Sequence, residues 1–223
     1  MWMVQLPVST KYEKRIPKTK FYQHLSLSNK VKQQFVDEID SVIWQHKLSP
    51  ETLGIAAGEE VQEIEVFEIR LRRRGISNNL LEIMDRQIPY HIVFVLTYDG
   101  MAQVVIGYKE KSKRKDATYR VEKYVRSDWC SPDDCMPVLK GLNLDSVYEH
   151  LLREYLPEEH PQRDDLGETI ALQTEIEKQT ALCAALEKKM KKEKQFNKQV
   201  RLNRELRVER KKLEGMLSEQ TFK

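Results

Sequence analysis

The stretch from 66 to 109 constrains the fold most, because it holds the only long apolar strand candidates in the chain. Residues 92–96 form a continuous apolar run, rich in β-branched and aromatic side chains, which is typical of a strand covered on both faces. Asp99-Gly100 follows, and Asp-Gly between two apolar runs is a strong hairpin signal. The sequence therefore predicts a buried strand joined by a tight turn to a second strand over 101–108.

Two elements precede this hairpin and one follows it. Residues 61–71 are a further strand candidate, and residues 78–86 have the apolar spacing of a short helix that ends before Pro89. The alternation of apolar and polar residues over 61–71 is interrupted at Val66 and Phe67, which are both apolar. This indicates either a bulge or burial of both faces of the strand. If the two strands are neighbours, the helix makes them parallel with a right-handed crossover. The alternating segment 119–125 adds a fourth strand.

Helices are expected on either side of these strands. Residues 29–47 carry one apolar stripe at helical spacing, and residues 144–155 carry another. Residues 1–20, which include a basic stretch over 11–20, are interpreted as an extended arm that lies on the domain. The alternatives are a short edge strand over the alternating residues 2–8 and an arm that contacts a nucleic-acid backbone. The predicted fold class is α+β, a small mixed sheet of about four strands flanked by helices.

The C-terminal segment differs in composition from the rest. Pro157 and Pro161 mark a boundary, which divides the chain into an α+β domain over 1–160 and a helical tail over 161–223. Residues 168–214 lack Pro and Gly, so we expect one long projecting helix of about 70 Å. This helix would carry two apolar seams, one in each half, and the spacing of the second is out of register with that of the first. The two seams favour a coiled coil with a stutter over a solvated single helix. The predicted interface with a partner helix comprises Leu172, Ile176, Leu186, Met190, Leu202, Leu206 and Leu213.

The net charge of +3 is concentrated in this tail. Residues 161–223 hold 15 Lys and Arg against 11 Asp and Glu, a net +4, which leaves −1 for the remainder. Basic clusters of one sign attract phosphates without reading bases, although a solvated helix face is an equal alternative. The candidate nucleic-acid-binding residues are Arg72, Arg73, Arg74, Lys113, Arg114, Lys115, Lys191, Lys194, Lys198, Arg201 and Arg204.

Patterns that carry catalysis are weak in this chain. It has no Gly-rich phosphate loop and no nucleophile motif, so no catalytic residue and no cofactor is predicted. Cys130 and Cys135 lack the second thiol pair that a structural zinc site needs, so a turn is predicted here rather than a metal site. A divergent metal-dependent nuclease would have to use Glu63, Glu65 or Glu122, without the Glu-x-Lys spacing that such enzymes need.

Targeting signals are also missing from the sequence. No signal peptide is visible, and no apolar run approaches the ~18 residues of a membrane span. Three cysteines give no even disulfide framework. We therefore expect a cytoplasmic protein without a membrane partner.

Four segments resemble a known family: Arg-Ile-Pro-Lys-Thr-Lys-Phe-Tyr over 15–22, the run over 43–52, Val-Phe-Glu-Ile over 66–69, and Ile-Pro-Tyr-His-Ile-Val-Phe over 88–94. They are similar to the domain of unknown function 4391, and the resemblance extends over about 10–215. It implies a prokaryotic, cytoplasmic protein that is often encoded beside methylases and helicases of restriction or phage-defence loci. The family has no assigned activity, so no functional residue is transferred.

The favoured hypothesis is a non-catalytic accessory or adaptor protein, of a restriction-modification or phage-defence locus, that acts through its helical tail. Its partner would be a helical protein or a second copy of the chain. The alternatives are a nucleic-acid-binding protein that uses the basic clusters on DNA, and the divergent nuclease.

Overall fold

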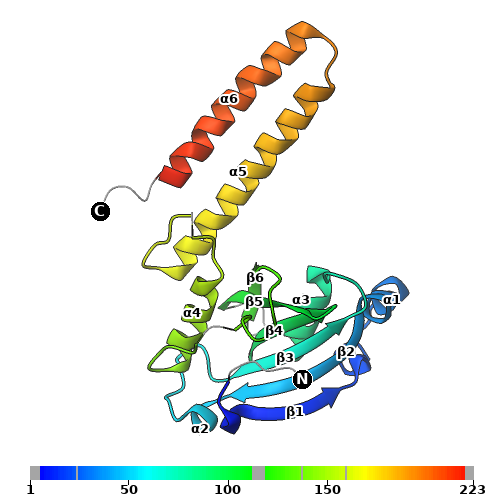
Figure 1. The fold of residues 1–223 in the computed structure, drawn as a ribbon, viewed down its shortest axis with the longest axis vertical. Helices are drawn as coiled ribbons and strands as arrows, with labels where there is room; N and C mark the ends of the chain where they lie inside the picture. The colour runs from blue at the N-terminus through cyan, green and yellow to red at the C-terminus, as the bar shows by residue number, and fades with distance from the viewer. Residues whose placement is uncertain (1–5, 24, 112–118, 137, 159, 219–223) are drawn as a thin grey trace. The chain divides into compact units, whose positions relative to one another are not determined.

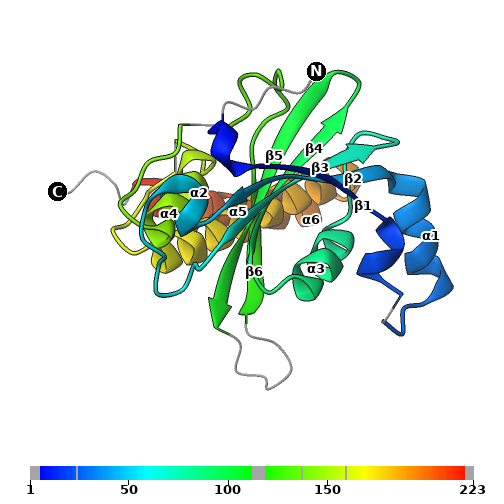
Figure 2. The same cartoon turned by 90° about the horizontal axis from the view of Figure 1, so that it is seen from below.

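The computed structural model describes residues 6–23, 25–111, 119–136, 138–158 and 160–218. The chain divides into two compact units, Met1–Leu156 and Pro157–Lys223. The first contains a six-stranded sheet in the order β1-β2-β3-β4-β5-β6 (Figures 1 and 2). The predicted mixed α+β class is confirmed, but the expected number of about four strands is wrong. The strands are β1 (Lys11–Ile16), β2 (Ile39–Leu48), β3 (Ile64–Leu71), β4 (His91–Tyr98), β5 (Met101–Lys111) and β6 (Tyr119–Arg126).

The centre of the sheet is the parallel pair β3 and β4, connected by α3 (Asn78–Gln87). Residues 92–96 of β4 are completely buried, as their uniformly apolar character predicts. In β3 every side chain except Arg70 is buried, which explains the broken alternation at Val66 and Phe67 by burial of both faces. The other strand pairs are antiparallel.

The predicted β4–β5 hairpin is confirmed. Its turn residues Asp99 and Gly100 have φ angles of 48° and 74°. Positive φ at both central positions is the backbone that Asp-Gly adopts readily, and its twist matches that of the flanking strands.

The helix expected over 29–47 is wrong in its second half. Helix α1 covers Asn29–Glu38, and the chain then enters strand β2 without a loop. Ile39, Val42 and Ile43 have helical spacing, but they are β-branched, and two register irregularities in β2 shift the alternation that a regular strand shows. Pairing with β3 therefore outweighs the helical pattern, since it buries Ile39 and Val42 completely in the sheet.

The basic stretch that we expected to form an arm supplies the edge strand β1. Its side chains are almost all exposed, and Lys14 pairs with Trp44 of β2. Charged side chains on an edge strand discourage further pairing. Residues 2–5 of the alternative N-terminal strand lie outside the described residues.

Helices cover both faces of the sheet. Phe35 of α1 and Leu81 of α3 pack with Phe67 and Phe94 in one apolar core. On the opposite face, α4 (Leu144–Glu154) places Tyr148 edge-on against His91, with ring centroids 4.6 Å apart. The short helices are η1 (Val8–Thr10), η2 (Lys18–Phe21) and α2 (Pro50–Leu53).

The C-terminal unit contains two helices where the sequence predicted one. Helix α5 (Leu166–Lys192) and helix α6 (Phe196–Ser218) pack side by side and antiparallel (Figure 1). Cys183 and Leu186 of α5 contact Leu202 and Leu206 of α6 in a small core. The two seams are therefore out of register because they belong to two helices that face each other. In the described part of the chain, no helix has the length and apolar content needed to cross a membrane.

We predict that Leu206→Ala destabilises this helical pair by about 2–5 kcal/mol, because a side chain that is 2% exposed leaves a cavity in a core of few residues. Hydrogen exchange of the α5 and α6 amides measures the effect. Val208→Ala is the matched control on the same helix, since Val208 is 55% exposed and should change the exchange little. Equal protection in both variants would contradict the packing described here.

Candidate nucleic-acid interface

The turn between α5 and α6 forms without glycine or proline. Glu193 takes an extended backbone conformation, with φ −74° and ψ 130°, which any residue can adopt. Its carboxylate accepts a hydrogen bond of 2.8 Å from the backbone amide of Gln195. Lys189, Lys191 and Lys192 occupy the last turn of α5, where cations interact favourably with the helix dipole.

We use the name hairpin tip for residues 187–204, which comprise the end of α5, the turn and the start of α6. This segment holds eight Lys and Arg against two Glu, a net +6, whereas the rest of 161–223 carries −2. All eight cationic side chains are exposed. The antiparallel pairing therefore gathers at one end cations that a continuous helix would distribute along its length.

The local carboxylates compensate little of this charge. Glu187 pairs with Lys191 at 2.9 Å and with Arg210, which lies outside the tip, at 3.0 Å. Within the described residues, no other tip cation lies within 4 Å of a carboxylate. The pKa of Glu187 is lowered, chiefly by its hydrogen bond to Lys191, so it stays ionised.

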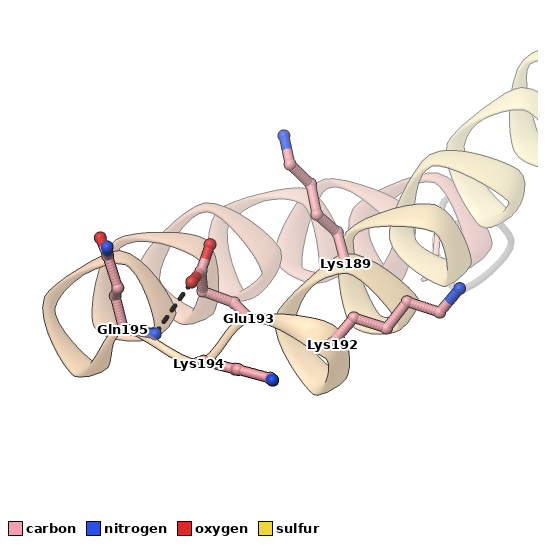
Figure 3. A pocket seen from close by; sticks show the side chains of 5 residues that line it. All are labelled: Lys189, Lys192, Glu193, Lys194 and Gln195. Atoms are coloured by element: carbon pink, nitrogen blue, oxygen red, sulfur yellow. Dashed lines mark hydrogen bonds between the residues drawn. The ribbon is translucent and has the colours of Figure 1, made fainter.

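A hollow of about 410 Å³ lies at the turn, lined by Lys189, Lys192, Glu193, Lys194 and Gln195. Figure 3 shows the lysine side chains extending outward from the turn. Phe196, the first residue of α6, is 75% exposed beside them. Cations, an open hollow and an aromatic ring thus meet at one end of the hairpin.

Of the predicted nucleic-acid-binding residues, Lys191, Lys194, Lys198, Arg201 and Arg204 all lie in the hairpin tip. Lys188, Lys189 and Lys192, which belong to the same basic run, complete it. A signal for the turn was present in the sequence, since polar Glu193 and Asn197 interrupt the first apolar seam.

The arginines after β3 are engaged locally. Arg72 pairs with Asp40 at 3.2 Å, Arg73 pairs with buried Glu38 at 2.7 Å, and Arg74 lies over the ring of Trp129. These contacts hold the loop after β3 against neighbouring elements. We interpret this cluster as structural.

The basic loop expected after the hairpin starts later than predicted. Residues 109–111 belong to β5, and Lys109 is buried in an ion pair of 2.8 Å with Asp85 of α3. Lys113, Arg114 and Lys115 lie outside the described residues.

The predicted partner-helix residues come together largely within the chain. Leu186, Met190, Leu202, Leu206 and Leu213 belong to the core between α5 and α6. Leu172 is half-buried and Ile176 is buried on α5. Binding of these residues to another chain stays a prediction.

The carboxylates proposed for a nuclease are not brought to one site. Glu63 directly precedes β3 and Glu65 is the second residue of that strand. Glu122 lies on β6 at the sheet edge and contacts Arg120 at 3.1 Å. In the described part of the chain, no group of three or more His, Cys, Asp or Glu side chains could hold a metal ion.

Glu65 is nevertheless the most unusual carboxyl of the sheet. It is 1% exposed, and burial together with the neighbouring Glu63 carboxylate raises its pKa to about 9. Glu63 pairs with Lys47 at 2.7 Å, so the charge of the Glu63 carboxylate is compensated. The carboxyl group of Glu65 is protonated at neutral pH.

Two further sites contain titratable groups. Burial lowers the pKa of His91 to about 3, so its ring is neutral; it lines a hollow of about 300 Å³ with Lys109, Lys111 and Tyr119. The thiols of Cys130 and Cys135 are free, and burial raises the pKa of Cys135 to about 12, which opposes formation of a reactive thiolate.

Comparison with known proteins places the chain in a family. A family model described as a domain of unknown function (DUF4391) matches residues 4–213. No curated protein and no solved structure gives a significant match.

We predict that Glu65→Gln changes how stability depends on pH. The pKa of Glu65 is higher in the folded state, at about 9, than in the unfolded state, where it is near 4.5. The protonated carboxyl therefore makes its full contribution to stability below pH 4.5, and this contribution is lost progressively as the pH rises to about 9. Glutamine does not titrate, so at pH 8 the variant should exceed the parent by about 1 kcal/mol or more, with no gain at pH 4. Urea unfolding at both pH values measures this.

Glu63→Gln is the companion variant: removing the neighbouring carboxylate should lower the pKa of Glu65, so the pH-dependent loss of stability should end at a lower pH than in the parent. Parallel pH profiles for Glu65→Gln and the parent protein would show that Glu65 is ionised in the folded state.

Proposed function

The chain belongs to the DUF4391 family, and because that membership assigns no activity, we propose from the geometry that it is a non-catalytic accessory protein that binds nucleic acid through its hairpin tip. The observation that carries this proposal is the net +6 of residues 187–204, displayed on exposed side chains around one turn.

A phosphate backbone is the polyanion that this surface fits. Nucleic acids carry closely spaced charges with condensed counterions, and exposed Lys and Arg release those ions on contact. The binding expected from such contacts is independent of sequence, because lysine and arginine on phosphates position a protein without reading bases. The lack of a catalytic constellation in the sequence supports an accessory role for the protein.

The other readings stay predictions with less support. A helical protein partner or a homodimer would use the apolar seam, but most of that seam packs within the chain. A nuclease would need its acidic residues at one site, and Glu65 and Glu122 are on strands separated by β4 and β5. The setting in a restriction-modification or phage-defence locus rests on the family resemblance alone.

The test compares two triple variants. Lys192, Lys194 and Lys198 of the tip are replaced by alanine in the first. The control replaces Lys178, Lys211 and Lys212, which removes the same charge from α5 and α6 away from the tip. Binding to labelled oligonucleotides is measured by fluorescence anisotropy across a salt series. We expect the tip variant to bind more weakly and its salt slope to fall by about 2–3, close to 0.7–0.9 per lost contact.

The control should retain the parent slope, and circular dichroism should show unchanged helix content for both variants. Equal weakening in the two variants would mean that total charge, not the tip, determines binding. No affinity of the parent protein at low salt would remove the proposal.

A further inference from the structure

Phe196 is the most exposed aromatic side chain among the described residues, at 75%. It opens α6 directly after the turn and takes no part in the core between α5 and α6. Burying such a ring would contribute about 1.5–3 kcal/mol of hydrophobic free energy, and the exposed ring makes no such contribution in the free protein. The helix start does not require it, since phenylalanine is a weaker helix former than alanine or lysine.

The surroundings of this ring are cationic. Lys194 lies two residues before it and Lys198 two residues after it, and both are exposed. The hollow lined by Lys189, Lys192 and Lys194 is also lined by Gln195, the residue that precedes Phe196. The exposed ring therefore offers a stacking surface within a segment whose sequence carries phosphate-binding lysines before and after it.

We infer that Phe196 stacks on an unpaired base and that the hairpin tip therefore prefers single-stranded nucleic acid to duplex. The inference rests on the proposed function and names its substrate class. Stacking of a base on an aromatic side chain contributes about 1–3 kcal/mol and tolerates any sequence. Bases inside a duplex are already stacked on each other, so the ring gains this contact only on a single strand or at an open end.

An anionic membrane surface is the competing ligand for lysines beside a phenylalanine. Interfacial binding needs a continuous apolar face along a helix. In the tip, Phe196 is the exposed large apolar residue, whereas Leu202 is buried and Met190 packs against the core of the hairpin. A single exposed ring in a cationic segment therefore matches an unpaired base and its phosphates better than a lipid surface.

The experiment compares the full-length protein with Phe196→Ala and Phe196→Tyr on one oligonucleotide, single-stranded and as a duplex. Loss of one stacked base should weaken single-strand binding by about 5–150-fold, with little change on the duplex and an unchanged salt slope. Tyrosine should restore binding, because its ring stacks as well. Quenching of 2-aminopurine in the single strand reports the stacking directly, and it should disappear in Phe196→Ala.

Val208→Ala is the matched control, since it removes another exposed apolar side chain from α6 without touching the tip. Equal loss on single strand and duplex, or no loss with Phe196→Ala, would overturn the inference. So would binding to phosphatidylglycerol vesicles that depends on Phe196 while oligonucleotide binding does not. If the lysine variant lowers affinity but the Phe196 variants do not, the inference alone fails; if neither matters, the proposed function fails with it.

Discussion

The apolar contact between α5 and α6 is the interaction on which the proposed surface depends. Cys183 and Leu186 meet Leu202 and Leu206, and Gln179 donates hydrogen bonds of 2.9 and 2.7 Å to the backbone carbonyl and the side chain of Glu209. This contact turns one run of helix-forming residues into two antiparallel helices. Cations at the end of α5 and at the start of α6 are thereby brought to one turn, so the electrostatic surface is a consequence of packing.

Burial of apolar side chains also determines the architecture of the sheet unit. Strand β4 is apolar on both faces, so helices must cover both sides, and α1 and α3 on one face and α4 on the other provide that cover. Some ionisable side chains remain inside this cover. Asp85 pairs with Lys109, whereas Glu65, which is 1% exposed, is protonated at neutral pH.

The sequence predicts elements best where a single pattern dominates. The apolar run of β4, the Asp99-Gly100 turn and the amphipathic helix α3 were all identified correctly. Prediction failed where two patterns overlap, because Ile39 and Val42 fit a helix as well as an irregular strand. It also failed at β1, whose exposed edge carries no apolar alternation. The turn at Glu193 has no glycine or proline to mark it, although the cations of the candidate site were predicted from the sequence.

Whether the tail turns back within one chain is tested most directly by a distance. Spin labels at exposed positions 181 and 207 should report neighbouring helices, with axes about 8–10 Å apart plus the length of the labels. Dilution with unlabelled protein should leave this distance unchanged. A continuous helix would separate the two positions by about 40 Å, and that result, or a short distance that disappears on dilution, would contradict the hairpin and the concentration of charge at its tip.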